Sequence, residues 1–253
     1  MVSHRFSRLA GAWRVGDDFF ARAGVASGEP PPRGLVDRLE DLAVGGAPAA
    51  HVPAEVRAFF EDPSSLELRV RSRWQRGFRL AWRALRAVMG AVGQLYLPLE
   101  VAHVRTRMVA LDGAREGRAD ARGVVRTYVD TGEVFQVFAY GVATVKGAAL
   151  MSVAIPLPGG HLAGLLRLEA GPAAVTLTSR RASPDDATGV WFVTRWLSLR
   201  LPFEETLRFW SATSPDAPAD DRAWPDATLV ARHEQRLFGA LVVEHAYVFR
   251  PLR

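Results

Sequence analysis

Two histidines and a tyrosine near the end of the chain are the residues best suited to acid–base chemistry. His233 lies in one segment that alternates apolar and polar residues, and His245 and Tyr247 lie in the next. A three-residue loop, 238–240, would place His233 opposite His245, and its central glycine suits the left-handed conformation of such a loop. Because histidine titrates near neutral pH, we predict His233, His245 and Tyr247 as a catalytic set. The alternative is that each is a core residue with one satisfied hydrogen bond.

Four further side chains are predicted to contact a ligand, namely Arg126, Tyr128, Tyr140 and Trp82. Arg126 and Tyr128 share one face of a predicted strand. If that face points inward, the guanidinium can hold a carboxylate or enolate oxygen. The other face of the strand is more apolar, which favours an outward, solvated Arg126.

The sequence contains none of the compact motifs that define common enzyme classes. It lacks the nucleophile elbow, the phosphate-binding loop and the dinucleotide fingerprint, and it has no cysteine. Its six histidines are scattered without metal-ligand spacing, so neither a metal site nor a cofactor is predicted. Glu204 and Glu205 follow Pro202, a position more typical of a helix start than of a catalytic pair.

The composition indicates a folded protein with a sizeable core. The 253 residues are 49% apolar and 23% charged, which excludes a disordered chain. The longest uncharged apolar run, 87–99, is shorter than the roughly 20 residues that a membrane-spanning helix needs. Residues 1–13 lack the apolar stretch of a signal peptide, so we expect a cytoplasmic location.

One long amphipathic helix is predicted over residues 78–96. Apolar side chains recur there at alternating spacings of four and three residues, and they are Phe78, Trp82, Leu85, Met89, Val92 and Tyr96. Four arginines lie together at one side of this stripe, and they are Arg76, Arg79, Arg83 and Arg86. We expect Trp82 and Leu85 to be buried against a sheet, with the arginines in water. The helix could instead lie on an anionic membrane surface or meet an acidic partner.

From residue 99 onward the apolar period is close to two, which indicates β-strands. About nine candidate strands follow one another with short glycine-rich turns, and this favours an antiparallel meander over βαβ units. A sheet of this size tends to close, which removes its exposed edges. The predicted fold is α+β, with an N-terminal helical arm over 1–63. Residues 64–253, including helix 78–96, form a large antiparallel barrel-like or strongly bent sheet of calycin or lipocalin type.

Several short stretches share a recognisable pattern, and they are 56–61, 93–99, 126–140, 155–159 and the spacing of His233 to Gly239. Together they resemble a family of uncharacterised bacterial proteins, over roughly residues 55–250 of this chain. No activity is known for that family, so the resemblance implies no catalytic residue. In the family pattern a histidine and a tyrosine are adjacent near the end, whereas Ala246 separates them here.

Basic charge is concentrated around the predicted helix. The net charge is +5, and residues 64–92 hold seven arginines against one acid. Since no nucleic-acid-binding module accompanies them, no nucleic acid is predicted as a partner. We expect the barrel to hold a hydrophobic small molecule. The protein is then either a cofactor-independent cyclase or isomerase acting on a polyketide- or lipid-like substrate, or a non-catalytic carrier. Peripheral membrane association through helix 76–96 is a third possibility.

Overall fold

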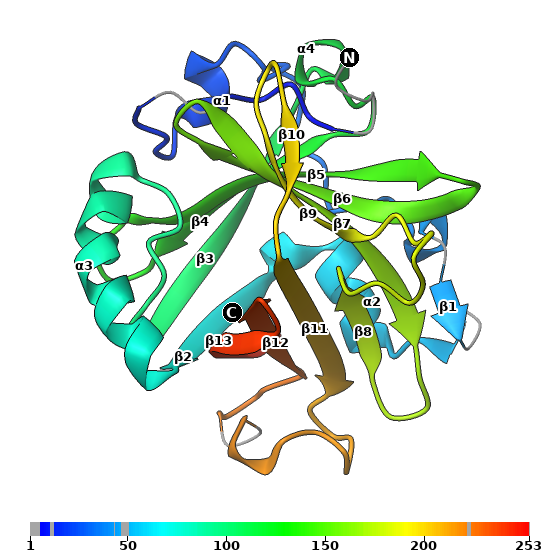
Figure 1. Cartoon of the computed structure of the whole chain (residues 1–253). Coiled ribbons are helices and arrows are strands. Elements are labelled where there is room, and N and C mark those ends of the chain that lie inside the picture. Colours follow the sequence, from blue (N-terminus) through cyan, green and yellow to red (C-terminus); the bar gives the residue numbers. More distant parts are fainter. Residues whose placement is uncertain (1–5, 11–12, 43, 47–50, 222–223, 253) are drawn as a thin grey trace.

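The protein folds into a closed β-barrel (Figure 1). The computed structural model describes residues 6–10, 13–42, 44–46, 51–221 and 224–252. Within these residues ten strands form the barrel wall. In chain order they are β2 (Leu66–Trp74), β3 (Val101–Ala110), β4 (Arg122–Tyr128), β5 (Val134–Val145), β6 (Ala148–Leu157), β7 (Gly160–Ala170), β8 (Val175–Thr178), β11 (Phe203–Ser211), β12 (Leu229–Leu237) and β13 (Ala240–Pro251).

The barrel closes at β8, which pairs with β7 on one side and with β11 on the other. All neighbouring strands of the wall are antiparallel, so the predicted antiparallel barrel is confirmed. The strands β9 (Gly189–Val193) and β10 (Ser198–Arg200) branch from β7, and β1 (Val44–Gly46) joins β7 in parallel. The calycin or lipocalin assignment is not confirmed, because lipocalin barrels have about eight strands.

Helices are few in the described part of the chain. They are α1 (Phe19–Arg22), α2 (Ala54–Glu61), α3 (Arg76–Val92) and α4 (Gly113–Glu116), with 3₁₀ turns at 39–41, 63–65 and 219–221. The predicted helical arm over 1–63 is not confirmed, because its described residues are mainly irregular between short helices. Residues 1–5, 11–12, 43 and 47–50 of that arm lie outside the described residues. The molecule is therefore mostly β rather than α+β.

The helix α3 is the long helix that the sequence predicts. It ends at Val92 rather than at residue 96, because Gly93 adopts a left-handed conformation with φ 67° and bonds back to the carbonyl of Gly90. Trp82 is half-buried and stacks on Trp74, with ring centres 4.8 Å apart. Leu85 is 45% exposed, so the expectation that it is buried against the sheet is wrong.

The main core fills the barrel, and α2 closes one end of it. Phe59 and Phe60 of α2 pack against Phe209 of β11, and Phe59 also contacts Phe249 of β13. These aromatic rings bury a large apolar area and prefer the tilted contacts seen here. Phe59 also lines the cavity inside the barrel, together with polar side chains.

The N-terminal segment covers part of the outer face of the barrel. Phe19 and Phe20 of α1 pack in one apolar cluster with Val125 of β4 and Val137 of β5. These strands are thus buried on both faces and lose the apolar–polar alternation of a half-exposed strand. This is why alternation misled the assignment of Arg126, whose neighbour Val125 points outward and is buried all the same.

Candidate functional site

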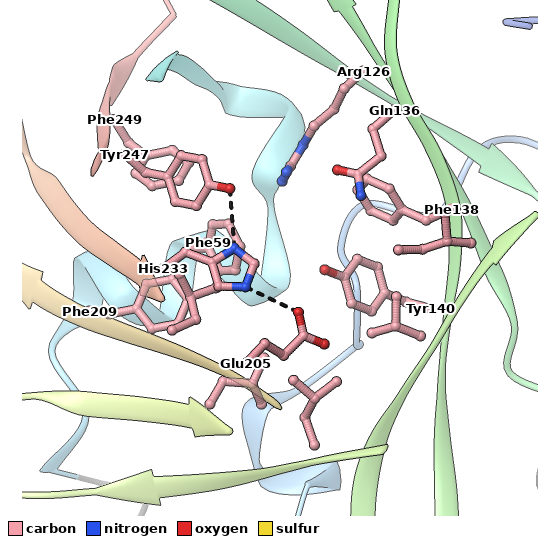
Figure 2. A pocket seen from close by; sticks show the side chains of 15 residues that line it. Phe59, Arg126, Gln136, Phe138, Tyr140, Glu205, Phe209, His233, Tyr247 and Phe249 are labelled. Atoms are coloured by element: carbon pink, nitrogen blue, oxygen red, sulfur yellow. Dashed lines mark hydrogen bonds and ion pairs between the residues drawn. The ribbon is translucent and has the colours of Figure 1, made fainter. Parts of the chain in front are cut away.

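A cavity of about 80 Å³ lies inside the barrel (Figure 2). Its polar lining residues are Arg126, Gln136, Tyr140, Glu205, His233 and Tyr247. The other lining side chains are apolar, and they include Phe59, Phe138, Phe209 and Phe249. The cavity therefore joins a cluster of polar groups to an apolar remainder, as ligand sites commonly do.

The polar groups come from two facing walls (Figure 2). Arg126 of β4 is the register partner of Gln136 on β5, and Tyr140 follows four residues later on the same face of β5. The other wall consists of β11, β12 and β13, on which Glu205 is aligned with Gln235 and thus lies close to His233. Antiparallel pairing brings these distant segments together.

Arg126 is buried at the cavity. It is 7% exposed, and within the described residues its guanidinium makes no hydrogen bond or ion pair, with a buried and unsatisfied Nε. The ring of Phe138 lies 5.1 Å from its guanidinium carbon, and Figure 2 shows the side chain pointing into the cavity. The Arg126 face is therefore inward, which corrects the outward orientation that the sequence favours. A buried cation of this kind calls for an anion.

His233 is held between an acid and a phenol. Its Nε2 lies 3.1 Å from Oε2 of Glu205, and its Nδ1 lies 3.3 Å from the hydroxyl of Tyr247. Burial raises the pKa of the Tyr247 phenol, so the hydroxyl stays protonated. Because the Glu205 carboxylate can only accept, Nδ1 of the neutral ring is the acceptor of the hydrogen bond from the Tyr247 hydroxyl. The imidazole then has its N–H at Nε2 and donates to the Glu205 carboxylate, which is the arrangement that stabilises a histidine accepting a proton.

Tyr140 faces this group from the opposite wall. Burial raises the pKa of Tyr140 to about 12, so its phenol remains protonated at any ordinary pH. In Figure 2 its hydroxyl points into the cavity, on the same side as Arg126 and Gln136. The lining of the cavity thus offers several hydrogen-bond donors and only one acid, Glu205, which is already hydrogen-bonded to His233.

His245 lies beside the cavity rather than on its lining. Its ring centre is 5.9 Å from that of His233, and its Nδ1 lies 2.8 Å from the hydroxyl of Ser72. Its Nε2 is buried and has no hydrogen-bond partner among the described residues. Burial, reinforced by the nearby His233, lowers the pKa of His245 to about 3. His245 is therefore neutral at ordinary pH. The three residues of the predicted catalytic set share one face of the sheet, but of these three only His233 and Tyr247 line the cavity.

The register of the β12–β13 hairpin is the predicted one, but it arises differently. His233 is aligned with His245, while the connection is the two-residue turn Phe238–Gly239 and not a three-residue loop. A β-bulge between Gln235 and Arg236 restores the parity, because an extra residue on β13 inverts the alternation once more. The effects of the two-residue turn and of the bulge on the alternation cancel, so His233 and His245 lie on the same face.

Two of the predicted ligand contacts lie outside the cavity. The hydroxyl of Tyr128 donates a hydrogen bond to the carbonyl of Tyr96, and its ring packs against Phe135. The indole N–H of Trp82 donates to the carbonyl of Leu97 at 3.3 Å. Both side chains help to fasten the segment after α3 to the barrel.

Glu205 is the site residue that sequence reasoning missed. The expected helix start at Glu204–Glu205 is wrong, since both residues lie on β11. A signal for it exists in the sequence. Glu205 interrupts an apolar face made by Phe203, Leu207 and Phe209, and an acid on such a face needs a partner.

No metal site stands out in the part of the chain that the structure describes. Within it, no group of three or more histidine, aspartate or glutamate side chains could hold a metal ion. The His233–Glu205 pair by itself supplies too few ligands for a structural zinc site, which takes four.

Comparison with known proteins gives a distant relative. The chain is 24% identical, over 237 residues, to the uncharacterized membrane protein YndJ of Bacillus subtilis (strain 168). The match covers 92% of this chain and 41% of that protein. No protein-family model and no solved structure matches. The predicted resemblance to uncharacterised bacterial proteins is confirmed.

The comparison also corrects the expected cytoplasmic location. The matched protein is named a membrane protein, which contradicts that expectation. Among the described residues, no helix combines the length and apolarity that crossing a bilayer requires. The expectation had rested on the composition of residues 1–13 and on the length of the longest apolar run, and neither feature is informative about surface attachment.

Proposed function

We propose that the barrel binds a small molecule in its interior and that Arg126 holds an anionic group of this molecule. The buried, unpartnered guanidinium is the observation that carries the proposal. A carboxylate would supply both the missing charge and two acceptors in a geometry that matches the guanidinium. Gln136 and Tyr140 extend toward the same space and add donors for that group (Figure 2).

The size and lining of the cavity favour a short-chain carboxylate. Its volume of about 80 Å³ is roughly half that of an engineered cavity of about 150 Å³ that holds benzene. By proportion, the cavity accommodates a group of about three or four non-hydrogen atoms. An entire polyketide- or lipid-like molecule exceeds this volume. The phenylalanines of the lining suit the alkyl part of a small acid.

Thermal unfolding with matched ligand pairs tests this binding. Formate and acetate are expected to raise the melting temperature at millimolar concentration, whereas formamide and acetamide, of the same shape without charge, leave it unchanged. Arg126→Met should abolish the response, and Glu204→Gln, on the neighbouring position of β11, should keep it. Native mass spectrometry of freshly purified protein would identify an acid that co-purifies. Equal responses to acids and amides, or a response that survives in Arg126→Met, would refute the role of Arg126.

A proton-transfer enzyme is the second candidate function, and the His233 arrangement favours it. With Glu205 on Nε2, the imidazole can accept a proton at Nδ1 from a carbon next to the bound carboxylate or carbonyl, once the Tyr247 hydroxyl turns from Nδ1 to the substrate. Arg126 then stabilises the enolate oxygen. The step moves one proton from carbon to His233 and leaves the electron pair on the substrate. Such chemistry is that of an isomerase and requires no cofactor.

Hydrogen–deuterium exchange of a substrate analogue separates the enzyme from the carrier. Incubation of acetone, which has four non-hydrogen atoms, with the protein in deuterated water should speed the exchange of its methyl protons above the buffer rate, as followed by proton NMR. His233→Gln and Glu205→Gln should lose the acceleration, and Glu204→Gln should keep it. Binding of acids without any accelerated exchange would leave the non-catalytic carrier.

A further inference from the structure

The helix α3 has three distinct sides. Successive residues of a helix are about 100° apart, so Phe78, Trp82 and Met89 lie together on the side that packs toward the barrel. Leu80 and Val88 lie on another side, where they are 70% and 51% exposed. Alanines 84, 87 and 91 complete this side, which we call the outer apolar stripe. In Figure 1, α3 stands at the margin of the molecule with no element covering its outer side.

The third side of α3 is wholly basic. It consists of Arg76, Arg79, Arg83 and Arg86, and the helix contains no acidic residue. Arg86 lies over the ring of Tyr96 at 3.8 Å, and Arg79 lies 3.9 Å from the exposed Glu100. Neither Arg76 nor Arg83 has an ion-pair or hydrogen-bond partner among the described residues. These two arginines are therefore available to a partner outside the chain.

The two available arginines border the outer apolar stripe. Leu80 follows Arg76 by four residues and precedes Arg83 by three, and residues at these separations are neighbours on a helix surface. Cations beside exposed leucine, valine and alanine side chains form a surface that is apolar in its middle and basic at its edge. That is the pattern of helices lying in the headgroup region of anionic bilayers.

We propose that α3 attaches the protein to an anionic membrane surface, with the outer apolar stripe at the acyl boundary and Arg76 and Arg83 on lipid phosphates. The proposal is independent of the ligand cavity. A bilayer fits this surface better than an acidic protein does, because the outer apolar stripe consists of leucine, valine and alanine side chains and presents no polar group for specific pairing. The 17 residues of α3 span about 25 Å, and the helix is far too polar to cross the bilayer.

Flotation with large unilamellar vesicles tests the attachment of the full chain. Binding is expected with phosphatidylcholine–phosphatidylglycerol vesicles, to fall with rising salt, and to be absent with phosphatidylcholine alone. Arg76→Gln with Arg83→Gln should lower the partition coefficient about 30-fold, from the loss of two cations at the surface. Leu80→Ser with Val88→Ser should lower it as well. Arg33→Gln with Arg105→Gln removes the same charge elsewhere and should change it far less.

A fluorescent probe reports where the contact occurs. Because the chain has no cysteine, Val88→Cys carries one environment-sensitive dye, and Arg105→Cys on β3 carries the matched control. The dye at position 88 should shift to the blue on anionic vesicles, and the dye at 105 should not. Unchanged melting temperatures show that each variant is folded. Failure to bind anionic vesicles, an equal loss in both arginine pairs, or a shift at 105 alone would overturn the proposal.

Discussion

Among the described residues, two arginines are buried under opposite conditions. Arg118 is 5% exposed, and its guanidinium bonds to the Glu116 carboxylate and to the carbonyl of Ser152. Arg126 is 7% exposed and has no such partners among the described residues. Removing a charge from water is costly, and only compensating contacts offset that cost. The two residues should therefore contribute to stability with opposite signs.

Replacing each arginine by methionine tests this difference. Arg126→Met should raise the free energy of unfolding of the ligand-free protein by about 1–3 kcal/mol, because it removes an uncompensated buried charge. Arg118→Met should lower it by about 3–5 kcal/mol, because it strands the buried Glu116. Urea unfolding of the three proteins gives these differences. A loss of stability in Arg126→Met as large as in Arg118→Met would mean that Arg126 is satisfied within the fold.

The positions of the site side chains relative to one another could be predicted from the sequence only where they belong to a single hairpin. His233, His245 and Tyr247 belong to one hairpin, so the sequence was enough to place them on one face. Glu205 reaches His233 from β11 across the long 212–228 connection, a contact that residue spacing does not indicate. The orientation of Arg126 likewise depends on the N-terminal segment that buries the outer face of β4.

At the scale of elements, the turn between β12 and β13 contains an unfavourable residue. Phe238 and Gly239 have φ values of 50° and 78°, as a two-residue hairpin turn requires at both positions. Phe238 is 80% exposed, so its side chain contributes little burial in return. The left-handed conformation suits glycine and asparagine but strains other residues. Periodicity predicted both strands correctly, but it could not reveal a turn whose first residue is this atypical.

Phe238→Asn is therefore expected to stabilise the protein. The gain in free energy of unfolding should be on the order of 1 kcal/mol, since asparagine relieves the left-handed strain. Phe238→Ala is the matched control, because it removes the ring while the strain remains, and it should give no gain. Thermal and urea unfolding would show the difference. A decrease in stability for Phe238→Asn would indicate that the Phe238 ring makes a contact that its exposure does not suggest.

At the scale of the whole molecule, closure depends on one short strand. The four residues of β8 connect β7 to β11, and thereby join the two ends of an otherwise open sheet. The sequence predicted a large antiparallel sheet that tends to close, since exposed edges are unfavourable. The partner of each edge could not be predicted, because β8 and β11 are separated by the excursion of β9 and β10. The cavity exists only because of this non-local pairing.

Two buried histidines link the stability of the whole barrel to pH. Burial lowers the pKa of His245, inside the barrel, to about 3. It lowers the pKa of His161, beneath the N-terminal segment, to about 4. Both pKa values are below the 6.5 of an unperturbed histidine. Between pH 6.5 and these lowered values, the unfolded chain therefore binds more protons than the folded one. The free energy of unfolding should therefore decrease as the pH falls from 6.5 toward 4.

The expected slope is steep and can be assigned to these residues. Each histidine contributes up to about 1.4 kcal/mol per pH unit once the unfolded form is fully protonated. Urea unfolding at about pH 7.5, about 6, about 5.5 and about 5 measures the slope of the free energy of unfolding against pH. These values lie above the range in which most carboxylates titrate. His161→Gln with His245→Gln should flatten it, and His51→Gln, at an exposed position, should not. A double variant that keeps the wild-type slope would show that other groups take up the protons, because glutamine cannot be protonated in either state.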